Sequence, residues 1–132
     1  MAERRTIERP LSPHLQVYRL TLTMAMSIVH RITGAVLYFG TLLLVWWLIA
    51  VSSSAKQFEI FSGFFASWFG QLILFGYTWA LLHHMLGGIR HFLWDTGHGF
   101  EPKEREFLAV ATVVGSIVLT LLVWTLAYML KG

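Results

Sequence analysis

The class of this protein is decided by one stretch of its sequence, residues 27–51, which reads SIVHRITGAVLYFGTLLLVWWLIAV. The part from Ile32 to Val51 contains no charged side chain. About 20 apolar residues in a helix cross the roughly 30 Å hydrocarbon core of a bilayer. Because lipid offers the backbone no hydrogen-bond partners, such a segment must satisfy its own amides and carbonyls as a helix. The stretch therefore predicts a transmembrane helix over residues 27–51.

Two further uncharged runs follow, from Ile60 to Ile89 and from Phe107 to Leu130. They predict transmembrane helices over residues 65–92 and 107–130. The composition agrees, because 56% of the residues are hydrophobic and only 13% are charged, about half the charged share of a soluble domain. We expect an all-α integral membrane protein, residues 1–132 as one membrane-anchor domain, with a short N-terminal arm or helix that Ser12 would cap.

The positive residues predict the orientation in the membrane. Two of the ten, Lys56 and Lys131, lie on one side of the predicted spans, and the other eight lie on the opposite side: Arg4, Arg5, Arg9, Arg19, Arg31, Arg90, Lys103 and Arg105. The N-terminus and the second loop are therefore expected in the cytoplasm. The first 20 residues show neither a secretory signal nor a transit peptide, which favours a bacterial inner membrane over a mitochondrial one. Positive residues that flank apolar runs do not indicate a nucleic-acid partner.

The second span carries a candidate haem ligand in WALLHHMLGGIRHFLWD, residues 79–95. His84 and His91 are seven residues apart and so share one helix face, together with small residues at Gly76, Ala80 and Gly88. A flat porphyrin needs little side-chain bulk around an imidazole ligand, and imidazole is a common axial ligand of haem iron. The pattern predicts haem ligation by His84. The alternative is that the small residues serve close helix packing and that His84 bonds to a neighbouring helix.

The first span carries a polar stripe at its expected cytoplasmic end. Ser27, His30 and Arg31 lie at the depth of Arg90 and His91 in the second span. Haem propionates are anions that need hydrogen-bonding and cationic partners, a role predicted for His30, Arg31 and His91. Hydroxyl and guanidinium groups also donate to quinone oxygens as negative charge develops, which predicts a quinone site at Ser27 and Arg31. Taken alone, Arg31 fits an interfacial anchor equally well.

The remaining features predict packing and limit the chemistry of the chain. His83 points about 100° away from His84 and is expected to pack or form a hydrogen bond. In the third span a row of small residues predicts a packing seam: Ala109, Thr112, Gly115, Ser116 and Thr120. The sequence contains no cysteine, which excludes a thiolate-ligated iron–sulfur cluster within this chain.

Three motifs, RPLSPHLQVYR, SIVHRITG and HHMLGGIRHFLWDTG, resemble the cytochrome b large membrane-anchor subunits of succinate dehydrogenase, respiratory complex II. The resemblance implies half of a six-helix bundle that a second, smaller anchor subunit completes. One haem b would lie between the two subunits, with His84 as one axial ligand and His30, Arg31 and His91 near the propionates. Ser27 and Arg31 would contact ubiquinone. An iron–sulfur subunit and a flavoprotein subunit would supply the electrons, with no succinate oxidation in this chain.

Several alternatives remain open at this point. In one, haem serves only as a structural element of the anchor and electrons pass directly to quinone. In another, the chain is a self-contained cytochrome with His30 and His84 as the two ligands, although these residues are expected at different depths. A transporter or channel is disfavoured because the outer halves of the three spans contain few polar residues. The tandem pair His83–His84 departs from the family pattern.

Overall fold

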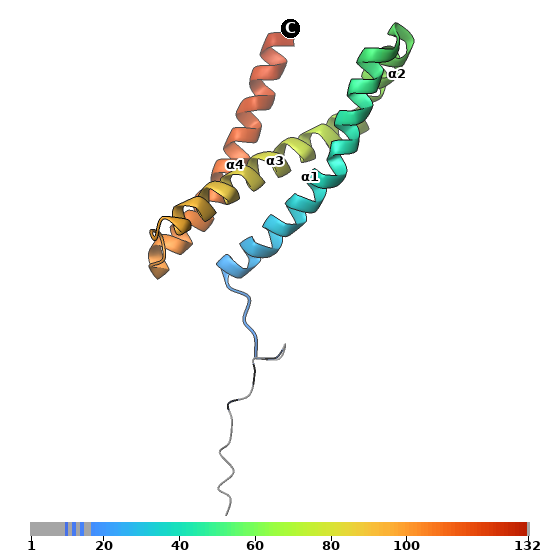
Figure 1. Cartoon of the computed structure of the whole chain (residues 1–132). Coiled ribbons are helices and arrows are strands. Elements are labelled where there is room, and N and C mark those ends of the chain that lie inside the picture. The colour runs from blue at the N-terminus through green and yellow to red at the C-terminus, as the bar shows by residue number, and fades with distance from the viewer. Residues whose placement is uncertain (1–9, 11, 13, 15–16, 132) are drawn as a thin grey trace, which may run out of the picture.

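A computed structural model describes residues 10, 12, 14 and 17–131 of the chain, and these residues contain helices and no strand (Figure 1). The four helices are α1 (Leu22–Ser53), α2 (Ala55–Ala66), α3 (Trp68–Asp95) and α4 (Pro102–Lys131). By length and composition, α1, α3 and α4 are each able to cross a membrane. The prediction of an all-α membrane protein with three long apolar helices is confirmed.

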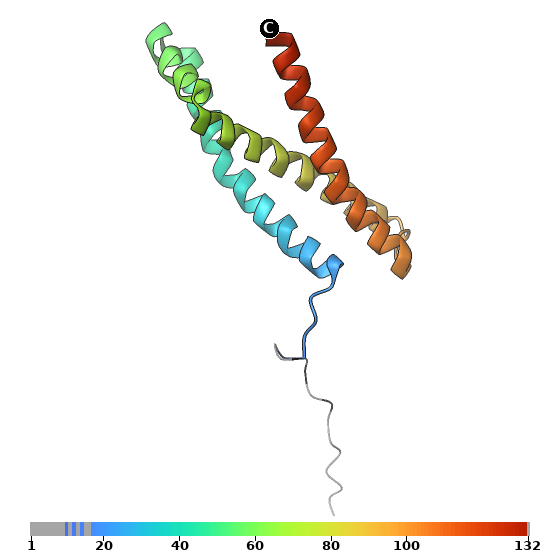
Figure 2. The same ribbon diagram turned by 180° about the vertical axis from the view of Figure 1, so that it is seen from behind.

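Helix α3 packs against both α1 and α4, which lie on either side of it. The N-terminal end of α1 and the loop between α3 and α4 lie at one end of the molecule, and α2 and the end of α4 lie at the other (Figures 1 and 2). The positive residues that were expected on the cytoplasmic side therefore lie, as far as the structure describes them, at one end of the molecule. The predicted topology requires this arrangement.

Serine and threonine side chains mark where the first three helices begin. Thr21, Ser54 and Ser67 are the N-caps of α1, α2 and α3, and each hydroxyl accepts a hydrogen bond from an amide three residues later, at 3.1–3.4 Å. Helix α4 begins with Pro102, which lacks an amide hydrogen and therefore loses nothing at a first helical position. The turn before it contains two glycines at positive φ, Gly97 and Gly99.

Helix α2 was missed by the sequence prediction, and the predicted span over residues 65–92 begins inside it. The uncharged run from Ile60 to Ile89 conceals the break at Ser67, whose hydroxyl caps α3 while its amide bonds back to the carbonyl of Phe64. Aromatic contacts hold α2 against α1, because the Trp46 ring lies 5.0–5.8 Å from the rings of three residues: Phe61, Phe64 and Phe65.

The other boundaries differ by a few residues. Helix α1 begins five residues before the predicted span, because the hydroxyl of Thr21 caps it at Leu22. Helix α4 begins at Pro102 instead of residue 107, because its charged first turns extend beyond the apolar run. The short helix expected after Ser12 falls largely outside the described residues. Among those described, the amides of Val17 and Tyr18 both donate to the carbonyl of His14 at 3.0 Å.

The helices meet through small and polar residues, and most large apolar side chains face outward. The predicted seam on α4 is confirmed, because four of its members are buried: Ala109, Thr112, Ser116 and Thr120. Helix α3 buries Ala80, His83, Gly87 and Arg90. Of these, His83 lies against Ser116 of α4, and Gly87 lies against His30 of α1. Large hydrophobic residues remain exposed along all four helices. The chain therefore presents wide apolar faces for lipid or for other membrane helices.

The tight α2–α3 junction yields a stability prediction. A Cβ atom at Gly70 would collide with the backbone of Phe64 and Phe65, which cannot rotate away, whereas a Cβ atom at Gly63 in α2 meets nothing within 4 Å. We expect Gly70→Ala to lower the free energy of unfolding by about 1–3 kcal/mol. Gly63→Ala, the matched control, should be neutral or stabilising by up to about 1 kcal/mol. Thermal unfolding of the full chain in mild detergent measures both, and equal stabilities would contradict the packing described.

Candidate functional site

His84 lies half-buried where α3 meets α1. Its Nδ1 is 3.2 Å from the carbonyl oxygen of His30 and 3.3 Å from the hydroxyl oxygen of Thr33, both in α1. The close approach depends on a glycine, because a Cβ atom at Gly34 would lie 3.1 Å from Cε1 of the His84 ring. The imidazole is therefore held by groups on a neighbouring helix rather than by its own.

The surroundings of Nδ1 determine which ring nitrogen of His84 carries the proton. The hydroxyl of Thr33 lies 3.0 Å from the carbonyl oxygens of Val29 and His30 and donates its single hydrogen to them. Both groups beside Nδ1 of His84 are then acceptors, so we assign the proton to Nδ1. The lone pair is left on Nε2. An Nδ1–H bonded to a backbone carbonyl is the usual way in which proteins orient a metal-binding imidazole.

His30 packs face to face on His84, with ring centroids 4.0 Å apart and an interplanar angle of 6°. Gly87 makes room for it, because a Cβ atom there would lie 2.5 Å from Nδ1 of His30. That nitrogen is buried and has no hydrogen-bond partner in the part of the chain that the structure describes, which leaves Nε2 as the nitrogen of His30 that can bind another group.

The stacked rings argue against a cytochrome that uses His30 and His84 as its own two ligands. Axial ligands approach an iron from opposite faces of a porphyrin, each with a ring nitrogen directed at the metal. Two rings stacked at 4.0 Å leave no space for a macrocycle between them. In addition, the described residues contain no group of three or more His, Cys, Asp or Glu side chains able to hold a metal ion.

The predicted polar residues lie around this pair at the same end of α1 and α3. The exposed His91 ring is 5.2 Å from the His30 ring and 5.1 Å from Trp94. Ser27 and Arg31 are both exposed on α1, one helical turn apart. The structure thus brings His30, His84 and His91 together, and it shows no contact between these histidines and Ser27 or Arg31 among the described residues.

His83 has a different role from His84. It is 2% exposed, and its Nδ1 lies 3.1 Å from the hydroxyl oxygen of Ser116 in α4. Its ring also packs 5.1 Å from the ring of Trp79. The prediction that His83 packs and forms a hydrogen bond is confirmed, and the bond ties α3 to α4.

Thr33 is the site residue that sequence reasoning missed. It is 1% exposed, and its hydroxyl links the His84 ring to the backbone of α1. The sequence does contain a signal for this role, because Thr33 follows His30 by three residues and so lies on the same helix face. A threonine in an apolar run, however, commonly bonds to its own helix, which hides a second role.

An apolar groove of about 640 Å³ lies between α1 and α3, and Thr33 and Ala80 are among the residues that border it. Small residues open α3 along this side, because Cβ atoms at Gly76 and Gly88 would meet nothing within 4 Å. His84 itself does not line this groove, but its hydrogen-bond partner Thr33 does, so the groove begins beside the imidazole.

The fold and this site define an all-helical, multi-pass membrane protein that presents one oriented imidazole at a helix interface. Comparison with known families places it more closely, because residues 5–123 match the family described as succinate dehydrogenase/fumarate reductase transmembrane subunit. The chain belongs to this family, as its motifs predicted.

Individual relatives agree with the family assignment. The chain is 44% identical over 122 residues to the succinate dehydrogenase cytochrome b556 subunit of Paracoccus denitrificans, covering 92% of this chain and 94% of that protein. It is 38% identical over 117 residues to the subunit of the same name in Rickettsia felis, covering 89% and 91%. The cytochrome b560 subunit of Marchantia polymorpha is 38% identical over 103 residues, covering 74% and 75%.

Proposed function

We propose that this chain binds haem b in the membrane domain of a bacterial succinate dehydrogenase and forms part of the site where ubiquinone is reduced. One observation carries the proposal: the hydrogen bond from Nδ1 of His84 to the carbonyl of His30 leaves Nε2 free on a fixed imidazole. The names of the relatives, cytochrome b556 and cytochrome b560, support the same cofactor.

Haem b, when bound, supplies a one-electron redox centre. His84 would hold the iron through Nε2, and a second, smaller membrane subunit would supply the second ligand, because His30 is stacked on His84. Nε2 of His30, the exposed ring of His91 and the guanidinium of Arg31 would donate hydrogen bonds to the propionates. The Thr33 and His30 oxygens hold the ligand ring in place and increase its basicity.

Ser27 and Arg31 bind the quinone head group at the end of α1. Both side chains are exposed, so their donors are available to a ligand. The Ser27 hydroxyl and the Arg31 guanidinium hold one carbonyl oxygen of ubiquinone and stabilise the negative charge that develops on it during reduction. The remaining contacts to the quinone come from partner subunits.

The expected partners are inferred from the absence of cysteine in this chain and from its exposed apolar helix faces. It has no cysteine, so the iron–sulfur clusters that deliver electrons belong to an iron–sulfur subunit, and a flavoprotein subunit oxidises succinate. The exposed apolar faces of α1 and α3 pack against the second anchor subunit. We also propose that residues 1–132 act as a single membrane-anchor domain, with the N-terminal arm and the α3–α4 loop in the cytoplasm of a bacterium.

The tandem histidines provide a matched test of haem ligation. In the complex purified through a tag on this chain, His84→Ala should abolish or strongly shift the Soret band, because the iron loses an axial ligand. His83→Ala should keep the low-spin b-type spectrum, because His83 bonds to Ser116 in the three-helix core. The proposal fails if the spectrum is normal in the His84 variant, or if only the His83 variant alters it.

The quinone role of Arg31 is tested by two activities of the same preparation. Arg31→Ala should lower the rate of ubiquinone reduction about 100–1,000-fold, the effect of removing one donor to a developing oxyanion. Succinate oxidation by an artificial dye, which bypasses the membrane site, should stay normal. Arg19→Ala is the control, because Arg19 is also an exposed arginine near the start of α1. Equal quinone reduction in both variants would exclude the assignment.

A further inference from the structure

Arg90 is a buried cation that the proposed function does not use. It is 4% exposed, and its Nε is buried with no hydrogen-bond partner among the described residues. Its guanidinium carbon lies over the Trp94 ring, 5.2 Å from the ring centroid. A charged side chain within a membrane helix costs about 2.5–3.5 kcal/mol near the bilayer centre and normally has a partner there. Among the described residues, Arg90 therefore has no anionic partner.

The position of Arg90 on α3 separates it from the haem ligand. Six residues correspond to about 120° around a helix, so Arg90 and His84 point in different directions. Arg90 lines a cavity of about 170 Å³ whose other walls come from α3 and α4 and not from α1: Leu86, Ile89, Leu93, Leu108, Ala111 and Thr112. The hydroxyl of Thr112 donates to the Leu108 carbonyl at 2.7 Å. The guanidinium is thus the donor that remains for a ligand in this cavity.

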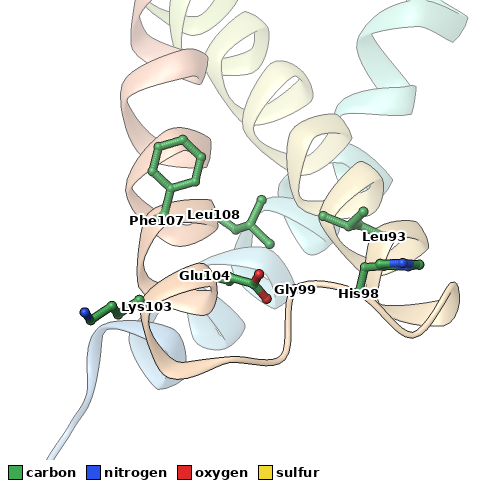
Figure 3. Close-up of a pocket in the computed structure, with 7 residues that line it drawn as sticks. All are labelled: Leu93, His98, Gly99, Lys103, Glu104, Phe107 and Leu108. Carbon is green, nitrogen blue, oxygen red and sulfur yellow. The ribbon is translucent and has the colours of Figure 1, made fainter.

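A second cavity extends this one toward the α3–α4 loop. It measures about 380 Å³ and shares Leu93 and Leu108 with the smaller cavity. Figure 3 shows the Glu104 side chain directed from α4 toward Gly99, with His98 on the opposite wall and the Phe107 ring above, whereas the ammonium end of Lys103 points away. Together the two cavities form a groove with mostly apolar walls, one buried cation at its deeper end and polar groups at the end of the helices.

We propose that this groove holds a glycerophospholipid of the adjacent leaflet, with its phosphodiester bound to Arg90. Basic pockets between transmembrane helices are known sites for anionic lipid head groups. The apolar walls accept the glycerol and acyl parts, which a free phosphate ion would leave unfilled. At about 170 Å³ the smaller cavity is below the range of about 300–1,000 Å³ for sites that enclose a whole small molecule, so it fits one ionic group. Glu104 at the rim disfavours a second negative charge beside the phosphodiester.

The test counts phospholipid in the assembled complex, purified in mild detergent through a tag on this chain without added lipid. Arg90→Gln should lose one tightly held phospholipid, measured by native mass spectrometry and by phosphorus content. Arg90→Lys, which keeps the charge, should retain it. The Soret band should stay unchanged in both variants, since neither haem nor quinone takes part in this site.

A second pair of variants keeps the test valid if Arg90→Gln does not assemble. Ala111→Phe fills the smaller cavity from an exposed position, and Val110→Phe adds the same ring at an exposed neighbour that does not line it. The lipid should be lost in the first variant and kept in the second. Equal phospholipid content in both variants would overturn the proposal. The proposal would also be overturned by an Arg90→Gln complex that keeps its full lipid content and has an altered haem spectrum. That result would make Arg90 a propionate partner.

Discussion

The hydrogen bond between Nδ1 of His84 and the carbonyl oxygen of His30 joins α1 to α3 and selects the ring nitrogen that faces outward. Its formation requires the helices to approach closely, which Gly34 and Gly87 permit. In water such a bond competes with solvent, but in a membrane interior an unpaired imidazole N–H is costly, so the bonded arrangement is strongly preferred. The packing of two helices and the chemistry of one nitrogen thus depend on the same contact.

Polar groups hold the rest of the bundle together because lipid tails are as apolar as leucine and provide little drive for apolar side chains to associate. His83 bonds to Ser116 between α3 and α4, and Trp124 donates to Thr78 in the outer half of the same interface. Two sides of α3 therefore have distinct uses. One orients His84 against α1, and the other packs on α4 through His83 and places Arg90 beside the groove between α3 and α4.

Long apolar runs made the fold class and the three spanning helices predictable, because a bilayer permits few structures for an uncharged segment of 20 residues. Helix α2 was not predictable in this way, since its break at Ser67 is a matter of local capping inside an uncharged run. The site histidines were predicted from their spacing and from the family motifs. The contact of the Thr33 hydroxyl with the His84 ring was not predicted, because it depends on which face of α1 meets α3. Likewise, the isolation of Arg90 follows from tertiary packing, since the sequence groups it with the other positive residues.

The central claim is that His84 offers Nε2 to haem iron while Nδ1 stays bonded to the backbone of α1. An experimental structure of the assembled complex, at a resolution that defines the imidazole planes, tests this most directly. We expect Nε2 of His84 within coordination distance of the iron and Nδ1 within hydrogen-bond distance of the His30 carbonyl. An iron bound to His83, to Nδ1 of His84 or to no histidine of this chain would contradict it.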